Sequence, residues 1–223
     1  MDDVVENKWN IGFVILLLSA FILSYIPLLN IPFTWFMTFF HEISHGLSAV
    51  LTGGSIEKIV IHIRGSGLCY TTGGYRFVIL QAGYMGAVLW GILIYEMADD
   101  ISHKYTNILA GFFAGLVALF AVLYARDVVT WLILAVLFTM FMSIMKLQKA
   151  MVTKLILKFL GLYILLDAVR APLHLIDGRN YGDGASLSDL TGVPEILWIC
   201  IWLATGVAGL IYLWRASQKI EVK

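Results

Sequence analysis

The chain has 223 residues, of which 60% are hydrophobic and 13% are charged. Soluble globular domains contain about 45–50% apolar and about 25% charged residues, so this composition excludes an ordinary soluble protein. Fifteen basic and fifteen acidic side chains cancel, and that balance gives no indication of nucleic acid as a partner. The charged residues lie between long uncharged apolar runs, which predicts an integral membrane protein that crosses the bilayer several times.

The first apolar run, Ile11 to Leu29, is close to the ~20 residues that cross a bilayer. The residues before it are acidic and no small-residue cleavage site follows it. This pattern favours an uncleaved first helix at about 10–29 over a signal peptide. The proline-containing segment Pro27 to Pro32 separates it from a second helix at about 33–51. Gly53-Gly54 then ends the second helix, because glycine is common just after helix C-termini.

The next segment, residues 55–77, has a different pattern. Isoleucines at 59, 61 and 63 alternate with other residues in "SIEKIVIHIRGSGLCYTTGGYRF". This period of two, rich in β-branched residues, predicts a strand. Gly65-Ser66-Gly67 supplies a turn, and Leu68 to Thr72 returns antiparallel. The segment is therefore predicted to be a β-hairpin between the second and third helices.

Five further helices are expected, and the first of them carries Gly83, Ala87 and Gly91 at a spacing that favours close helix packing. The expected ranges are about 78–97, 108–124, 128–146, 155–175 and 195–214. The predicted fold class is an all-α polytopic membrane protein of about seven membrane helices, with the β-hairpin inserted between helices two and three. Because the chain has no internal repeat, residues 1–223 are expected to form one domain with a core at about 33–200.

The sequence HEISH, residues 41–45, puts three ionisable side chains into the apolar second helix. His41 and His45 are four residues apart and therefore share a helix face, and two imidazoles in that spacing suit Zn²⁺. Glu42 is placed to act as general base on a metal-bound water, as in the H-E-x-x-H arrangement. Ionisable residues at membrane depth are costly and usually functional. We therefore expect a metal site here, rather than hydrogen bonds to neighbouring helices alone.

A catalytic zinc has three protein ligands, so a third ligand is expected from another part of the chain. Asp167 follows five apolar residues in "GLYILLDAVRAP" and lies well inside the sixth helix. A lone buried carboxylate needs a cation, and this predicts Asp167 as the third ligand. The alternative role for Asp167 is a salt bridge with Arg170 at i+3. Asp177 and Asp189 remain candidate ligands, because the polar loop that carries them can fold back to the metal.

Together these features resemble the site-2 protease family of intramembrane zinc metallopeptidases, and in particular its compact branch without a PDZ domain. The resemblance covers about residues 33–200. It rests on HEISH within a membrane helix, the "TGG" after it, the "GSG…TTGG" hairpin, the "AGYMG" helix start and "SDLTGVPEILW" near the C-terminus. Better-known members take the third ligand from an "LDG" element. This chain has "IDG" at 176–178, and Asp167 fits the aspartate of the compact branch.

The resemblance implies a zinc metalloendopeptidase that hydrolyses peptide bonds of membrane-embedded substrates. His41 and His45 would be zinc ligands and Glu42 the catalytic base. It also implies a multi-pass protein, of a bacterial-type cell membrane, whose partner is a transmembrane protein or peptide. Such a substrate must unwind, and its freed backbone groups then need partners. The hairpin offers a sheet edge that the substrate can join as an added strand, or it shields the site as a plug.

Two other functions compete with proteolysis. One is a proteolytically silent scaffold that binds membrane helices, and Glu42 argues against it because a scaffold has no use for a base. The other is an ion or proton transporter that uses the His/Asp site. The sequence lacks the inverted repeats and paired broken helices that are typical of transporters.

Overall fold

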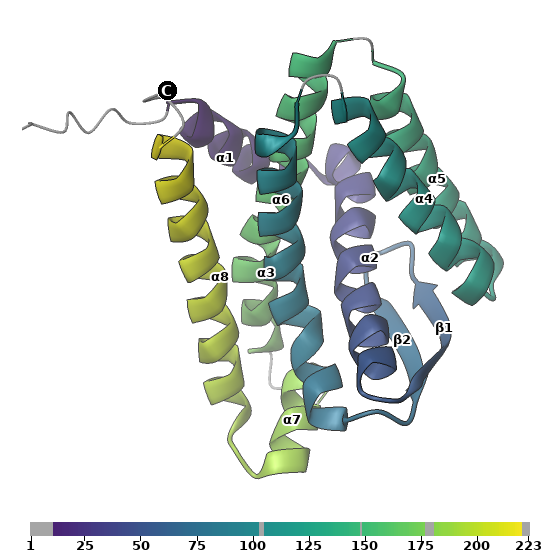
Figure 1. Ribbon diagram of the computed structural model, residues 1–223. Helices are drawn as coiled ribbons and strands as arrows, with labels where there is room; N and C mark the ends of the chain where they lie inside the picture. The colour runs from purple at the N-terminus through teal and green to yellow at the C-terminus, as the bar shows by residue number, and fades with distance from the viewer. Residues whose placement is uncertain (1–10, 103–104, 148, 177–180, 220–223) are drawn as a thin grey trace, which may run out of the picture.

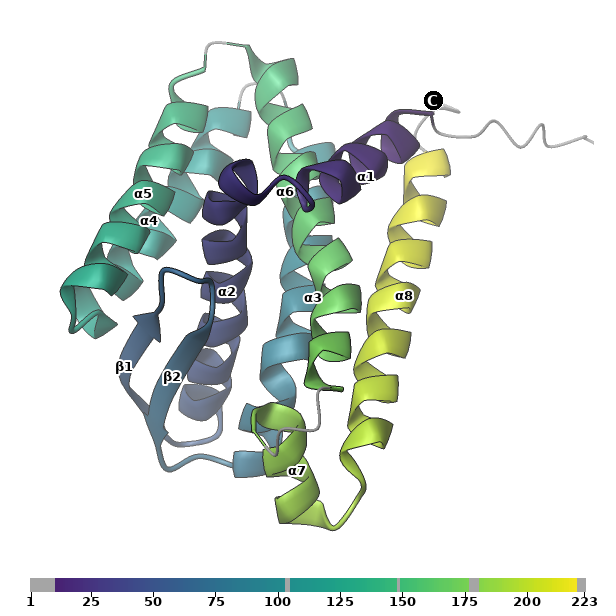
Figure 2. The same ribbon diagram turned by 180° about the vertical axis from the view of Figure 1, so that it is seen from behind.

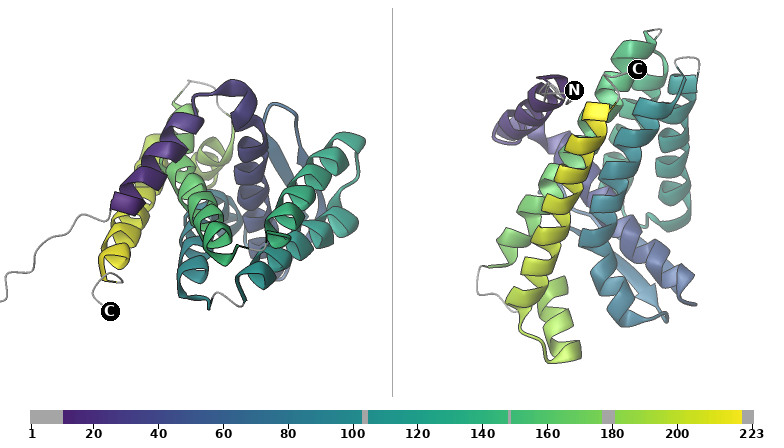
Figure 3. Two further views of the ribbon diagram at one scale, coloured as in Figure 1. Left: turned by 90° about the horizontal axis from the view of Figure 1, so that it is seen from above. Right: turned by 60° about the vertical axis from the view of Figure 1, so that its left-hand side comes forward.

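The computed structural model describes residues 11–102, 105–147, 149–176 and 181–219, which form a helical bundle with one small β-hairpin at its side (Figure 1). The elements in chain order are α1 (Ile11–Leu23), α2 (Pro27–Leu51), β1 (Ser55–Ile61), β2 (Gly67–Thr72), α3 (Arg76–Asp100), α4 (Thr106–Tyr124), α5 (Val128–Met145), α6 (Ala150–Arg170), η2 (Ala171–Leu175), α7 (Asp183–Thr191) and α8 (Glu195–Lys219). The helices α2, α3 and α6 form the middle of the bundle. α8 lies on one side of them, and α4 and α5 lie on the other (Figures 1 and 3).

The first two helices meet at a sharp elbow, where their axes bend by 108°. The predicted boundary was wrong, because α1 ends at Leu23 instead of about 29, and α2 begins at Pro27 instead of about 33. Proline is well suited to a first helical position, since its missing N–H has no intrahelical partner there. The guanidinium of Arg170 on α6 donates to the Ser24 hydroxyl in the elbow. This contact ties the N-terminal helices to α6.

Among the described residues, four helices are long and apolar enough to cross a membrane: α3, α4, α5 and α8. The bent pair α1–α2 makes a fifth candidate if it is counted as one span. The predicted seven spans are therefore not confirmed. α1 has only 13 residues, which is about 20 Å of helix and too short to cross alone. α6 is interrupted by charges at Lys154, Lys158 and Asp167.

The predicted hairpin is confirmed, with β1 and β2 antiparallel and Ile59 opposite Cys69. Figure 2 shows both strands alongside α2, with β1 toward α4 and α5. The outer edge of β1 is already covered. Ile59 bridges to Ala125 in the α4–α5 turn, and the Ile61 amide donates to Thr130 Oγ1 at 3.0 Å. In the described part of the chain, β2 is thus the strand whose outer edge has no further strand beside it.

The bundle is held by an aromatic core and by close backbone contact. Phe36, Phe39 and Phe40 on α2 are fully buried together with residues of α4 and α5. A Cβ atom at Gly91 would lie 2.9 Å from the Gly161 carbonyl oxygen, so these two glycines bring α3 and α6 into backbone contact. Small residues at such crossings are what allow membrane helices to approach closely.

The polar loop predicted after the sixth helix contains a helix of its own, α7, beneath the bundle and beside α3 and α8 (Figure 2). Pro172 lies in the 3₁₀ segment that ends α6, as expected from its missing backbone donor. α7 begins with Asp183, whose charge suits a helix N-terminus. It ends at Gly192, which adopts a left-handed conformation (φ 72°) that glycine reaches without strain. α7 brings a carboxylate below the HEISH segment.

Candidate metal centre

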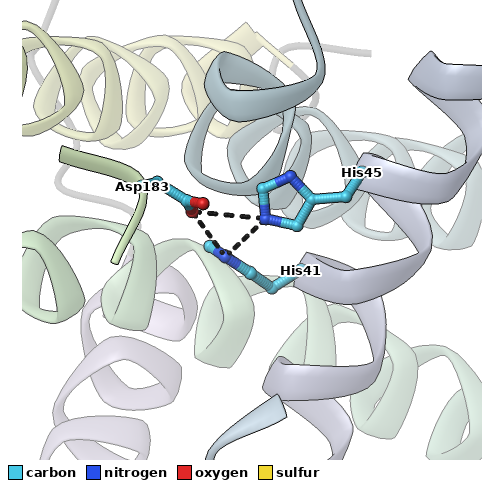
Figure 4. A group of neighbouring side chains, drawn as sticks. All are labelled: His41, His45 and Asp183. Atoms are coloured by element: carbon cyan, nitrogen blue, oxygen red, sulfur yellow. Dashed lines mark hydrogen bonds and ion pairs between the residues drawn. The ribbon is translucent and has the colours of Figure 1, made fainter. Parts of the chain in front are cut away.

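His41 and His45 lie on one face of α2, and their Nε2 atoms are 3.1 Å apart. The carboxylate of Asp183, at the start of α7, approaches both rings. Its Oδ2 atom is 3.3 Å from His41 Nε2 and 3.2 Å from His45 Nε2. Figure 4 shows the three side chains pointing toward one another from α2 and α7. They form the one group among the described residues whose His, Cys, Asp or Glu donor atoms converge as a metal site requires.

Contacts behind the imidazoles fix their orientation. His45 Nδ1 lies 2.7 Å from the Ile79 carbonyl oxygen, which can only accept a hydrogen bond. Nδ1 therefore carries the proton, and the lone pair of Nε2 is directed at the group's centre. The His41 ring packs edge-on against Tyr84, with centroids 4.7 Å apart, and Tyr84 stacks on Trp202.

Gly83 on α3 makes room for both rings. A Cβ atom there would lie 2.4 Å from His45 Nε2 and 2.5 Å from His41 Nε2. The sequence pattern had indicated that Gly83, like Gly91, serves helix packing alone. The structure assigns Gly83 a second role, because any side chain at this position would displace the two imidazoles.

Glu42 is 5% exposed and lies against the first residues of β2. A Cβ atom at Gly67 would be 2.6 Å from Glu42 Oε1, and the backbone amide of Cys69 donates to the Glu42 carboxylate. The hairpin therefore covers the carboxylate that the sequence had indicated as the base. Burial, together with the charge of Glu42, raises the pKa of the Cys69 thiol to about 12. Cys69 is not a member of the converging group of His41, His45 and Asp183.

The structure does not place Asp167 in the converging group. Asp167 lines the same cavity as His41, but the carboxylate that touches both imidazoles belongs to Asp183. The alternative role as a partner of Arg170 is not found either. No ion pair joins the two within the described chain, and Arg170 instead bonds Ser24 and lies over the Tyr25 ring.

The other two candidates have different outcomes. Asp177 lies outside the described residues. Asp189 lines the cavity but is not part of the converging group. The residue that sequence reasoning missed, Asp183, had one available signal. Glycine before it and the "TGVP" after Leu190 are typical of the two ends of a short helix, and a helix holds a carboxylate in place better than a loop does.

Electrostatic forces on Asp183 oppose one another. Burial acts to raise the pKa of its carboxyl, but protonated imidazoles lower it, through the charge of His45 and through hydrogen bonds from both rings. A metal ion in place of those protons would favour the carboxylate form in the same way. Two neutral imidazole nitrogens and one carboxylate oxygen are a donor set that suits a divalent metal.

A cavity of about 1030 Å³ contains the whole group. Its walls come from α2, the hairpin, α3, α6 and α7, and its polar lining includes Glu42, Asp167, Arg170 and Asp189. This polar lining can hold water between the apolar helices.

A family model described as Peptidase M50B-like matches residues 13–213. The match includes α2 with its histidines, the hairpin, α6 and the start of α7. No curated protein and no solved structure matches the chain.

Proposed function

This chain belongs to the Peptidase M50B-like family of membrane metallopeptidases, and on that premise we propose that it is a zinc endopeptidase acting on membrane-embedded substrates. The membership agrees with the resemblance to site-2 proteases that the sequence motifs carry. The convergence of His41, His45 and Asp183 beside the buried Glu42 is the observation that carries the proposal.

The donor set fits zinc in kind and in size. Ligands at about 2.0–2.1 Å from a tetrahedral zinc are about 3.3 Å from one another. The three donor separations here are 3.1, 3.2 and 3.3 Å. Asp183 is accordingly proposed as the third ligand in place of Asp167. Three protein ligands leave a fourth position for water or substrate, as in catalytic sites.

Zinc, when bound, acts as a Lewis acid toward the scissile carbonyl and makes a water acidic enough to be deprotonated near pH 7. Glu42 accepts the proton of the attacking water and delivers it to the nitrogen of the leaving amine. His45, held by the Ile79 carbonyl, keeps the tautomer that ligation requires.

The outer edge of β2 is proposed to bind the unwound substrate as an added strand. Backbone groups along an antiparallel strand alternate in direction. Because the Ile61 amide points away from β2, toward Thr130, its partner Gly67 also points its backbone away from β1. By alternation the same holds for Cys69, whose amide is already engaged by the Glu42 carboxylate, and for Thr71. All three residues line the cavity that contains the metal centre.

Thr71→Pro is expected to slow cleavage of a transmembrane peptide roughly fivefold to tenfold, because it removes one donor worth about 1 kcal/mol from the free edge of β2. Proline is tolerated at an edge strand whose N–H faces outward. Thr71→Val is the control, since it keeps the amide and the shape. Unchanged cleavage by a folded Thr71→Pro variant would contradict strand addition and favour a shielding role for the hairpin.

The function itself is tested on the purified protein by measuring its metal content and its cleavage of a labelled transmembrane peptide. We expect about one zinc per chain, loss of cleavage when a chelator removes the metal, and recovery when zinc is returned. A silent scaffold would bind the peptide without cutting it. Absence of metal from correctly folded protein would sink both the zinc site and the proteolytic function.

A further inference from the structure

A second cavity, of about 580 Å³, lies on the outer face of the hairpin, away from the metal centre. It is bounded by β1, by the hairpin tip and by the turn between α4 and α5. Three cations line it: Lys58 on β1, Arg64 at the tip and Arg126 in the turn, with His62 beside them. The family match and the proposed proteolysis assign this cavity no role.

Among the described residues, the one carboxylate that lines this cavity is that of Asp127. Both of its oxygens already accept hydrogen bonds from Thr130. Its Oδ1 accepts from the Thr130 amide at 2.8 Å and its Oδ2 from the Thr130 hydroxyl at 2.7 Å. Three cations against one engaged carboxylate leave the cavity positive. An anion is therefore the ligand that its electrostatics favour.

The cations retain donors for such a ligand. The Lys58 ammonium lies over the Tyr70 ring, 4.3 Å from its centroid, and no ion pair with a described carboxylate engages it. Arg126 donates to the carbonyls of Leu123 and Ala125, but a guanidinium has five N–H donors and these bonds use two. The side chains are thus anchored by their contacts while part of their donor capacity faces the cavity.

The position of the cavity identifies the kind of anion. The α4–α5 turn joins helices of 19 and 18 residues that each qualify as a membrane span. Such helices are about 27–29 Å long and match the hydrocarbon core, so their connecting turn lies at the membrane surface. Exposed apolar side chains occur at the hairpin tip and in the first turns of α5: Ile63 is 65% exposed, Val128 73% and Leu132 63%. A ligand with an anionic head and apolar chains can pair with the cations of the cavity and also pack against the exposed apolar side chains.

We propose that the cavity between β1, the hairpin tip and the α4–α5 turn binds the phosphate headgroup of an anionic membrane phospholipid. Basic pockets at helix ends are a recognised form of lipid-headgroup site. Arg64 and Ser66 line both this cavity and the one around the metal centre. The bound headgroup would therefore contact the same hairpin tip that forms one wall of the catalytic cavity.

The test is lipid retention by native mass spectrometry, after delipidated protein is mixed with equal amounts of phosphatidylglycerol and phosphatidylcholine in detergent. The wild type is expected to retain phosphatidylglycerol preferentially. The Lys58→Gln/Arg126→Gln variant should bind it roughly 30-fold more weakly, and Lys58→Gln alone about fivefold more weakly. The Lys58→Gln variant keeps the hydrogen bonds from Arg126 to backbone carbonyls. It therefore still tests lipid binding by the cavity if the double variant does not fold.

Lys146→Gln/Arg215→Gln is the matched control. It removes one lysine and one arginine from exposed positions at the other end of α5 and near the end of α8, and it should retain the lipid as the wild type does. Equal retention by the cavity variants, or equal loss in the control, would overturn the proposal. Displacement of the lipid by millimolar inorganic phosphate would overturn it in favour of a soluble anion. None of these measurements depends on cleavage.

Discussion

Glu42→Gln is expected to lower the rate of peptide cleavage by about 10²–10⁴-fold, the usual contribution of a general base, while the metal content stays unchanged. Glutamine has almost the shape of glutamate but cannot accept the proton of the attacking water. The donor atoms of His41, His45 and Asp183 are left in place. Folding should not suffer, because a neutral amide costs less to bury than the carboxylate that it replaces.

The measurement compares cleavage of a labelled transmembrane peptide with the zinc content of the same preparation. Glu57→Gln serves as the control, since this glutamate is exposed on β1 and bonds Thr72 on the facing strand. Cleavage by Glu42→Gln at the wild-type rate would show that the base is another residue. Loss of the metal would instead make Glu42 a ligand.

Asp183→Asn should weaken zinc binding by more than about 100-fold, because loss of outer contacts alone costs 10–100-fold and Asp183 touches both imidazoles. Asp167→Asn should bind zinc nearly as the wild type does, since Asp167 lies in the cavity wall outside the converging group. The two variants are matched, as each converts one aspartate of the cavity to its amide. Competition with a chromophoric chelator measures both affinities.

The opposite result would restore the assignment made from the sequence. If Asp167→Asn lost the metal and Asp183→Asn kept it, the approach of α7 to the histidines would be incidental. Cleavage assays on the same variants add a second reading. Asp183→Asn should lose activity together with zinc, and excess zinc should restore part of it.

The HEISH segment could be interpreted from the sequence because its evidence is local. Residues four apart must share a helix face, and the burial cost of His41, Glu42 and His45 follows from the apolar residues around them. The hairpin was equally local. A period-two run beside a glycine turn has one favourable structure, and its register follows from that turn.

Elements whose ends depend on the rest of the molecule were predicted less well. Apolar composition alone does not distinguish a straight span at 10–29 from a 13-residue helix that meets the next helix at an angle of 108°. That elbow depends on contacts with Arg170, far away in the sequence. The same holds for Gly83. Its role in leaving space for the two imidazoles is apparent only when α3 is packed against the histidines of α2.

From the sequence, composition predicted a membrane protein and the spacing of His41, Glu42 and His45 predicted a metal site on the second helix, because both signals act over short stretches of chain. The identity of the aspartate beside that site came from the fold, which brings Asp183 to both histidines. Burial within a helix favoured Asp167, but coordination depends on where separate elements meet in space. The packing of α7 beside α3 and α8 places Asp183 against both imidazoles. This contact between α7 and α2 depends on how all the helices of the bundle pack.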